Sequence, residues 1–267
     1  MKYRILFLGQ KPIGEECYTL LSKSQSKNIK IKTVVSNEKK TNWWKSNYIY
    51  ENSKKNNIKF ISNEKKNENE IIDSIKEHKI NLIISVQHCW IFSDKILKSV
   101  NGNAYNLHNA KLPDYKGYNT INHAILKNDS TYSSTIHKID KKVDSGDIIF
   151  EKSCEINNNE TAQSLHKKSF KLSILIFNEF IEFLKGKKKI HPIKINEKGK
   201  FYSKNSLDNH RIIKEIDNFV EIDRKARAFY FPPFEPAYFI IKKKKNFIFC
   251  LIFKKNFDVF FKYLRSR

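Results

Sequence analysis

Residues 81–86 form the apolar run that most limits the fold of this chain. The run reads Asn-Leu-Ile-Ile-Ser-Val, without alternation of polar and apolar side chains. That pattern is typical of a strand buried on both faces of a parallel sheet. Such a strand requires a helix layer on each side, because both faces of the sheet must be covered. At 267 residues and 40% hydrophobic content, the chain is long and apolar enough for this core, which excludes a disordered protein.

Strand-like and helix-like segments alternate through the first part of the chain. The strand-like segments before the central run are residues 3–8, 29–35 and 57–61. The helix-like segments are the one that carries Cys17, Leu20 and Leu21, and residues 71–77. This order predicts a Rossmann-like, doubly wound, mostly parallel α/β sheet. The first turn has only Gly9 and Gly14, so the glycine pattern of dinucleotide-binding folds is absent and a nicotinamide cofactor is not expected.

The second part of the chain predicts further elements and a boundary. Residues 120–126 read as a helix, and residues 134–139 and 147–150 read as strands. Residues 161–183 predict one long amphipathic helix, whose expected apolar positions are Leu165, Phe170, Leu172, Leu175, Phe177 and Phe180. A lysine-rich segment follows it, so we expect a catalytic domain over residues 1–185 and a small C-terminal α+β region over residues 186–267. Two apolar runs around residues 242–246 predict that this region ends in a β-hairpin.

Lysine dominates the charge of the chain. Lys and Arg number 51 against 28 for Asp and Glu, for a formal net charge of +23. An excess of this size attracts polyanions. The lysines are nevertheless spread along the sequence rather than gathered in one basic patch, which favours a compositional bias over a nucleic-acid surface. A basic field of this kind also attracts a diphosphate-bearing substrate.

The cysteines and apolar runs bear on compartment and membrane contact. The four cysteines are far apart and show no C-x-x-C spacing, which argues against a zinc site or a disulfide framework. The N-terminal apolar run is too short for a signal peptide, and the runs at residues 247–253 and 257–261 are too short to span a bilayer. We therefore expect a cytoplasmic protein without metal and without membrane insertion.

Two short motifs carry the candidate chemistry. Asn106 and His108 lie two residues apart on an expected extended segment, followed by Leu112-Pro113 and Gly117. Residues two apart on a strand point to the same side, so the amide and the imidazole converge. Some distance downstream, Asp144-x-Gly146-Asp147 places a carboxylate on a glycine-containing loop.

An amide, an imidazole and a carboxylate together can move an acyl group onto an amine. The amide donates to the developing oxyanion, the imidazole moves the proton, and the carboxylate fixes the tautomer and charge of the imidazole. Asp147 competes with Asp144 for the carboxylate role. Each residue alone is more often a turn or surface residue, but their joint spacing favours a catalytic role.

With this pair of motifs, the chain resembles the folate-dependent formyltransferase family over about residues 1–185. The resemblance implies 10-formyltetrahydrofolate as formyl donor and Asn106, His108 and Asp144 as catalytic residues. It also implies folate contacts in the segments after the central strand and before Asp144. The expected cofactor-binding residues there are Val86, Gln87, His88, Trp90, Ile91, Lys138 and Asp140.

Departures from the family pattern indicate a branch. Where relatives that act on tRNA or purine precursors read His-x-Ser-Leu-Leu-Pro, this chain reads His-Asn-Ala-Lys-Leu-Pro from His108. This segment, and residues 227–237, are similar to formyltransferases that act on dTDP-linked 4-amino-4,6-dideoxyglucose for surface-polysaccharide (O-antigen) synthesis. The resemblance implies a homodimer through the C-terminal hairpin. The expected substrate-binding residues are Lys11, Tyr118, Asn119, Tyr230, Phe234 and Glu235.

Several alternatives stay open at the level of sequence. Methionyl-tRNA formylation is the second hypothesis, although the segment after residue 189 is short for the C-terminal barrel of that class. A non-enzymatic nucleic-acid-binding protein would use the charge alone, and its binding would weaken steeply with salt. Neither the position of the acceptor amine, C-4 or C-3, nor the nucleotide, dTDP or UDP, follows from the sequence.

Overall fold

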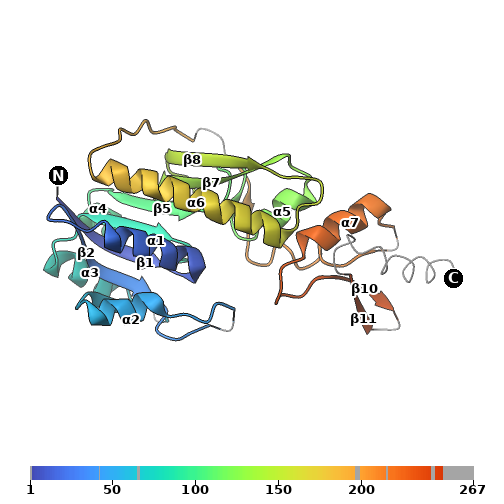
Figure 1. The fold of residues 1–267 in the computed structure, drawn as a ribbon, viewed down its shortest axis with the longest axis horizontal. Coiled ribbons are helices and arrows are strands. Elements are labelled where there is room, and N and C mark those ends of the chain that lie inside the picture. Colours follow the sequence, from blue (N-terminus) through green and yellow to red (C-terminus); the bar gives the residue numbers. More distant parts are fainter. Residues whose placement is uncertain are drawn as a thin grey trace. The chain divides into compact units, whose positions relative to one another are not determined.

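A seven-stranded sheet with helices on both faces organises the first part of the computed structural model (Figure 1). The structure describes residues 2–41, 43–64, 67–195, 199–214, 216–241 and 244–248. Strands and helices alternate in the order β1 (Tyr3–Gly9), α1 (Lys11–Lys23), β2 (Ile29–Ser36), α2 (Tyr48–Lys55), β3 (Lys59–Ser62), α3 (Glu68–Glu77), β4 (Leu82–Val86), α4 (Asp94–Ser99) and β5 (Ala104–His108). The remaining elements are β6 (Lys116–Gly117), α5 (Thr120–Leu126), β7 (Thr131–Lys138), β8 (Ile148–Glu155), α6 (Ala162–Leu184), β9 (Phe201–Tyr202), α7 (Phe219–Ala228), β10 (Ala237–Ile241) and β11 (Lys244–Ile248).

The strand order confirms the predicted sheet. It is β3-β2-β1-β4-β5-β7-β8, with parallel pairing from β3 through β5 and antiparallel pairing of β5 with β7. All five residues of β4 are buried, as the apolar run at its centre predicts. β4 lies between β1 and β5, so the carboxyl ends of three parallel strands meet at one edge of the sheet. Ligands bind at such an edge in open α/β sheets.

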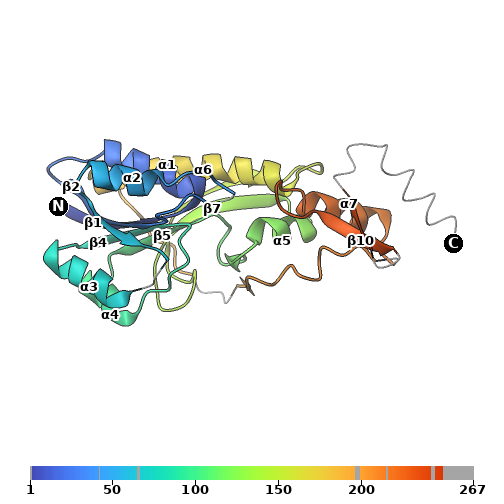
Figure 2. The same ribbon diagram turned by 90° about the horizontal axis from the view of Figure 1, so that it is seen from below.

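Two apolar layers cover the sheet. One contains Phe7 with side chains of α1, α2 and α6, and the other contains Leu6 with side chains of α3 and α4. Figure 2 shows α1, α2 and α6 above the sheet and α3 and α4 below it. Phe7 and Leu6 are neighbours on β1 that point to opposite faces, so the continuous apolar run of a central strand fills both layers at once.

Helix α6 is present as predicted, but one of its apolar positions does not lie on the buried face. Leu175 is 52% exposed, whereas Ile176, Phe177 and Phe180 are buried. The buried stripe also includes the small polar residues Ser169 and Ser173. With 3.6 residues per turn, Leu175 lies on the far side of the helix from this stripe.

Three short helices were not predicted from the sequence. They are α2, α4 and α7, of 8, 6 and 10 residues. Helices of fewer than about three turns give little periodicity to detect. For α7 the signal lay in its first turn. Asn218 and Glu221 form a reciprocal capping box at its first turn. No helix among the described residues is long and apolar enough to cross a membrane.

The chain divides into two compact units. The first consists of residues 1–116, 133–153 and 170–200, and the second of residues 117–132, 154–169 and 201–267. The predicted division after residue 185 stays a prediction. Cys250, the apolar run at residues 257–261 and most of the run at 247–253 lie outside the described residues, and the three described cysteines are free.

A buried network holds the second unit together. The Arg227 side chain donates to Asp223 at 2.7 Å and to the carbonyl oxygen of Glu160 at 3.1 Å. Asn122 on α5 donates to the carbonyl oxygen of Ala228 at 2.7 Å. These bonds link α5, α7 and the segment before α6. They also fix the C-terminal end of α7, which the aromatic segment at residues 229–234 follows.

The turn after β4 is held in an unusual conformation. Gln87 has a φ of 53°, in the left-handed region. The backbone N–H of Trp90 donates to Nδ1 of His88 at 3.3 Å, and the two rings pack edge to face. Because Nδ1 accepts a hydrogen bond, the proton of the neutral ring is on Nε2, which is buried without a partner. Desolvation lowers the pKa of His88 to about 3.

We predict that His88 makes the fold sensitive to acid. Its folded pKa of about 3 lies below the unfolded value of about 6.5, so between these values the unfolded chain binds a proton that the folded chain does not. Lowering the pH from 7 to 5 should therefore reduce the free energy of unfolding of the wild type by about 1–2 kcal/mol more than it reduces that of His88→Phe. Urea unfolding followed by circular dichroism at both pH values measures this difference. Equal losses in the two proteins would contradict the assignment.

Candidate active site

Strand β5 presents Asn106 and His108 on one face of the sheet. Tyr105 and Leu107 pack into the layer of α1 and α6, and Ala104 packs into the layer of α3 and α4. Since side chains alternate along a strand, Asn106 and His108 lie on the same side as Ala104. This confirms the convergence expected from their i, i+2 spacing.

The carboxylate of Asp144 joins these two side chains. Its Oδ1 lies 3.4 Å from the amide nitrogen of Asn106, and its Oδ2 lies 3.7 Å from Nε2 of His108. The side chain of Asp144 is only 9% exposed, and that of His108 is 10% exposed. Asn106, His108 and Asp144, which are separated along the sequence, therefore form one compact and largely buried cluster.

The same carboxylate also faces His137, which the sequence reasoning missed. His137 lies on β7 directly opposite Asn106 in the antiparallel ladder. Its Nε2 is 3.3 Å from Oδ1 of Asp144 and 3.2 Å from the amide nitrogen of Asn106. The signal available in the sequence was its place in the predicted strand ahead of the Asp144 loop. The register that pairs it with Asn106 is a tertiary property.

Gly146 lets the Asp144 loop approach the end of β7. A Cβ atom at residue 146 would lie 2.1 Å from the carbonyl oxygen of Lys138, closer than any real contact allows. The backbone N–H of Lys138 donates to the carbonyl oxygen of Asp147 at 2.9 Å and closes the loop. Asp144 itself has a φ of 47°, which an aspartate tolerates better than most residues. The glycine of the motif thus serves close packing, which brings Asp144 rather than Asp147 to the cluster.

A backbone carbonyl fixes the ring of His108. Nε2 of His108 lies 2.7 Å from the carbonyl oxygen of Tyr115. A carbonyl oxygen only accepts, so Nε2 carries a hydrogen. In the neutral ring the lone pair is then on Nδ1, and this is the atom that can take up a proton.

Buried polar contacts hold the segment between His108 and Lys116. The hydroxyl groups of Ser134 and Ser173 donate to Oδ1 of Asn109 at 2.7 and 3.2 Å. Thr135 donates to the carbonyl oxygen of Ala110 at 2.8 Å. The amino group of Lys116 donates to Ser145, next to Asp144, at 3.1 Å. These contacts explain why Asn109 and Ala110 occur in the motif: both are buried against β7, and Asn109 also meets α6.

The residues expected to bind the cofactor lie at the same edge of the sheet. Val86 ends β4, and Gln87 accepts a hydrogen bond from the amino group of Lys11 at 3.3 Å. Trp90 packs against the α3 and α4 layer, and Ile91 is 58% exposed. Burial lowers the pKa of the Lys11 amino group, an effect that nearby Cys89 opposes.

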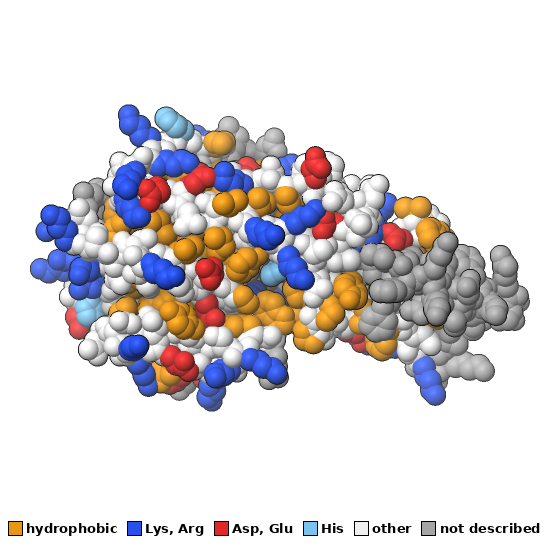
Figure 3. All heavy atoms as spheres, viewed as in Figure 1, with side chains coloured by type: hydrophobic (Ala, Val, Ile, Leu, Met, Phe, Trp, Pro, Cys, Tyr) orange, Lys and Arg blue, Asp and Glu red, His pale blue; other side chains and the backbone are white. Residues whose placement is uncertain are grey.

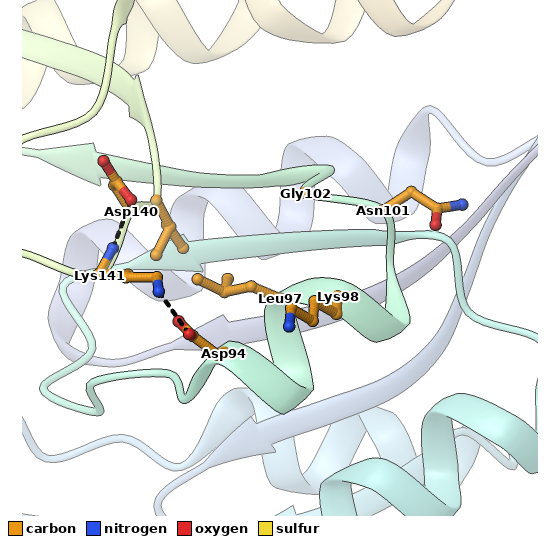
Figure 4. Close-up of a pocket in the computed structure, with 8 residues that line it drawn as sticks. Asp94, Leu97, Lys98, Asn101, Gly102, Asp140 and Lys141 are labelled. Carbon is orange, nitrogen blue, oxygen red and sulfur yellow. Dashed lines mark hydrogen bonds and ion pairs between the residues drawn. The ribbon is translucent and has the colours of Figure 1, made fainter.

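Asp140 lines a pocket of about 380 Å³ between α4 and the end of β7, and Lys138 is the last residue of β7. Its apolar wall consists of Leu97 and Ile139, and its rim carries Asp94, Asp140 and Lys141 (Figure 4). Lys141 forms an ion pair with Asp94 at 2.6 Å, and its backbone N–H donates to Asp140 at 2.7 Å. The carbonyl oxygen of Lys138 faces Nδ1 of His137 at 2.7 Å, so this backbone atom also supports the Asp144 cluster.

The other expected substrate residues belong to the second unit. Asn119 has a φ of 57° and donates to the carbonyl oxygen of Lys204 at 2.9 Å, and the neighbouring Tyr118 is 42% exposed. Phe234 is 54% exposed, and the carbonyl oxygen of Tyr230 accepts from Gln163 at 3.1 Å. Glu235 binds Arg211 at 3.1 Å and Lys245 at 2.7 Å. Their role in substrate binding stays a prediction.

On the face that Figure 3 shows, the positive charge is spread over the surface. Over the face shown in Figure 3, Lys and Arg side chains stand apart, among acidic and apolar ones. Many described lysines also pair with acidic residues, as Lys152 and Lys188 do with Glu179. This supports the interpretation of the lysine content as a compositional bias.

Comparison with known proteins adds to this geometry. The chain is 29% identical to a methionyl-tRNA formyltransferase of Legionella pneumophila over 158 residues, or 59% of this chain and 50% of that protein. A 4-N formyltransferase from Francisella tularensis has the same fold, with a TM-score of 0.75 at 24% identity over 92% of this chain and 96% of the other. An N-formyltransferase from Helicobacter canadensis was solved with folinic acid and dTDP-3-aminofucose. It has a TM-score of 0.70 at 22% identity, over 91% of this chain and 86% of the other.

The chain spans about half the length of the methionyl-tRNA formyltransferase that it matches. Its match to a family model is longer. Residues 1–179 fit the model described as formyl transferase, and this range contains the whole Asn106, His108, Asp144 and His137 cluster. The chain therefore belongs to the formyl transferase family.

Proposed function

We propose that this protein transfers the formyl group of 10-formyltetrahydrofolate to the amine of a nucleotide-linked amino-deoxysugar. The expected acceptor is dTDP-4-amino-4,6-dideoxyglucose, in a cytoplasmic step of surface-polysaccharide synthesis. The observation that carries the proposal is the meeting of Asn106 and His108 with the Asp144 carboxylate, at 3.4 and 3.7 Å.

Asn106 is proposed to stabilise the oxyanion of the tetrahedral intermediate. Its amide N–H group donates to the formyl oxygen as that oxygen gains negative charge. In related acyl-transfer sites one such donor contributes on the order of 3 kcal/mol. The site is largely buried, and a low-dielectric environment strengthens this interaction.

His108 is proposed to accept the proton that the attacking amine loses. The Tyr115 carbonyl holds Nε2–H, so the proton goes to Nδ1 and the ring becomes an imidazolium. Asp144 then lies beside a cation, with Oδ2 at 3.7 Å from Nε2, and favours that charged form. The bound donor supplies the formyl carbon as the electrophile. When the tetrahedral intermediate collapses, the bond from that carbon to the donor nitrogen breaks, and His108 returns its proton to this nitrogen so that tetrahydrofolate leaves.

The residues at the edge of the sheet fit a folate. Nε2 of His88 is a buried N–H group without a partner, which costs about 1–3 kcal/mol until an acceptor is provided. A pterin carries such an acceptor on a flat ring that apolar walls like Leu97 and Ile139 can contact. Val86, Gln87, His88, Trp90, Ile91, Lys138 and Asp140 are proposed to hold it. The Helicobacter protein of the same fold was solved with folinic acid.

The extent of the structural match favours a sugar acceptor. The Francisella and Helicobacter structures follow this chain over 92% and 91% of its length, which includes most of the second unit. In sequence, methionyl-tRNA formyltransferases match over 59% to 70% of this chain. Exposed aromatic rings such as Tyr118 and Phe234, with Lys11, Asn119, Tyr230 and Glu235, are proposed to contact the sugar nucleotide. Nucleic acid is not an expected partner.

A panel of acceptors tests the proposal. The purified protein with 10-formyltetrahydrofolate should add one formyl mass to dTDP-4-amino-4,6-dideoxyglucose. The panel also contains the 3-amino isomer, UDP-linked amino sugars and initiator Met-tRNA, with His108→Asn as the inactive control. Mass spectrometry of the acceptor is the readout. Formylation of Met-tRNA alone would overturn the sugar assignment in favour of the second hypothesis.

The choice of carboxylate is tested by a matched pair of variants. Asp144→Asn should lower kcat by at least about a hundredfold, because the imidazolium of His108 loses its counter-charge. Asp147→Asn, which keeps the main-chain bond to Lys138, should lose much less. Steady-state kinetics and thermal unfolding of both variants give the comparison. If Asp147→Asn were the more impaired of two folded proteins, the roles would be reversed.

We also propose that the hairpin of β10 and β11 forms a homodimer contact. Ile240 and Phe247 are 56% and 43% exposed, and they lie on the same face of the hairpin. Pairing with a second copy would bury both side chains. Light scattering should give twice the mass of the chain for the wild type and a smaller mass for Ile240→Lys with Phe247→Lys. A monomeric wild type at micromolar concentration would refute the contact.

A further inference from the structure

His137 is the member of the buried cluster that the catalytic set does not use. Its side chain is only 2% exposed, and its ring contacts Asn106 and Asp144. A buried imidazole that meets two functional groups at 3.2 and 3.3 Å restricts how both can orient. The hydrogen-bond partners of Nδ1 and Nε2 decide which orientation of the Asn106 amide the ring favours.

The tautomer of His137 follows from its backbone contact. Nδ1 lies 2.7 Å from the carbonyl oxygen of Lys138. Because a carbonyl oxygen only accepts, Nδ1 carries the hydrogen, and the neutral ring has its lone pair on Nε2. Nε2 is therefore an acceptor that points at Asn106.

The orientation of the Asn106 amide follows from Asp144. The amide atom that lies 3.4 Å from Oδ1 of Asp144 must be the NH2 group, because a carboxylate accepts and repels another oxygen. The same NH2 group is 3.2 Å from Nε2 of His137. One of its hydrogens lies between these two acceptors, and the other remains for a further acceptor.

We propose that His137 is a positioning residue, which keeps the NH2 group of Asn106 turned toward the transferred formyl oxygen. The bond to Asp144, at 3.4 Å, is longer than a good hydrogen bond, so the carboxylate alone holds the amide weakly. Without the Nε2 acceptor, the amide samples orientations in which its oxygen faces the oxyanion and repels it. This inference rests on the proposed function, because it assigns His137 a task through Asn106.

Two substitutions separate the acceptor from the shape of the ring. His137→Phe keeps an aromatic ring and removes the acceptor. It should lower kcat at least about tenfold and change both KM values by less than about twofold, because a lost orientation of Asn106 affects the transition state more than substrate binding. His137→Gln offers an amide oxygen to Asn106 and should recover most of kcat. His78→Phe, at the end of α3, is the matched histidine control and should behave as wild type.

A spectroscopic readout keeps the inference separate from the activity. In 15N-histidine-labelled wild type at neutral pH, two-dimensional NMR should show His137 with Nδ1 protonated and Nε2 bare, assigned by its loss in His137→Gln. A protonated Nε2 would refute the inference even if formyl transfer is found. Full kcat in a folded His137→Phe would refute it as well. No formyl transfer by the wild type would instead refute the proposed function, and the NMR result would still report on the ring.

Discussion

The Asp144 carboxylate, held nearly out of water, is the interaction on which the site depends. A buried carboxylate is tolerated only where donors or cations surround it. Here the Asn106 amide and the His108 ring supply the donors, at 3.4 and 3.7 Å, and the His137 ring lies at 3.3 Å. Removal of the carboxylate would leave His108 without a counter-charge and Asn106 without one of its two acceptors. Each role in acyl transfer therefore depends on this group staying in place.

Two features of the backbone place the carboxylate there. The antiparallel pairing of β5 with β7, in an otherwise parallel part of the sheet, sets Asn106 opposite His137 on one face. Gly146 then allows the following loop to pack directly on the carbonyl oxygen of Lys138. That same oxygen faces Nδ1 of His137. One carbonyl group thus connects the path of the Asp144 loop with the tautomer of the ring beneath it.

The division of the chain into two units separates the buried cluster from the aromatic segment after α7. The formyl transferase match covers residues 1–179, and all members of the buried cluster lie in the first unit. The second unit holds the aromatic segment after α7, fixed by Asn122 and Arg227. Loop and appended segments vary more than the scaffold that carries the chemistry. This is consistent with relatives of one fold that differ in acceptor.

The sequence by itself determined the sheet class and the convergence of Asn106 and His108. The apolar run of β4 and the i, i+2 spacing of Asn106 and His108 are local patterns, and local patterns fix which face a strand side chain takes. The partner of Asn106 across the ladder, the exposure of Leu175 and the selection of Asp144 over Asp147 were decided only by the tertiary structure. Strand register, helix rotation and the close approach at Gly146 depend on contacts between segments far apart in the chain, and no spacing along the sequence records those contacts.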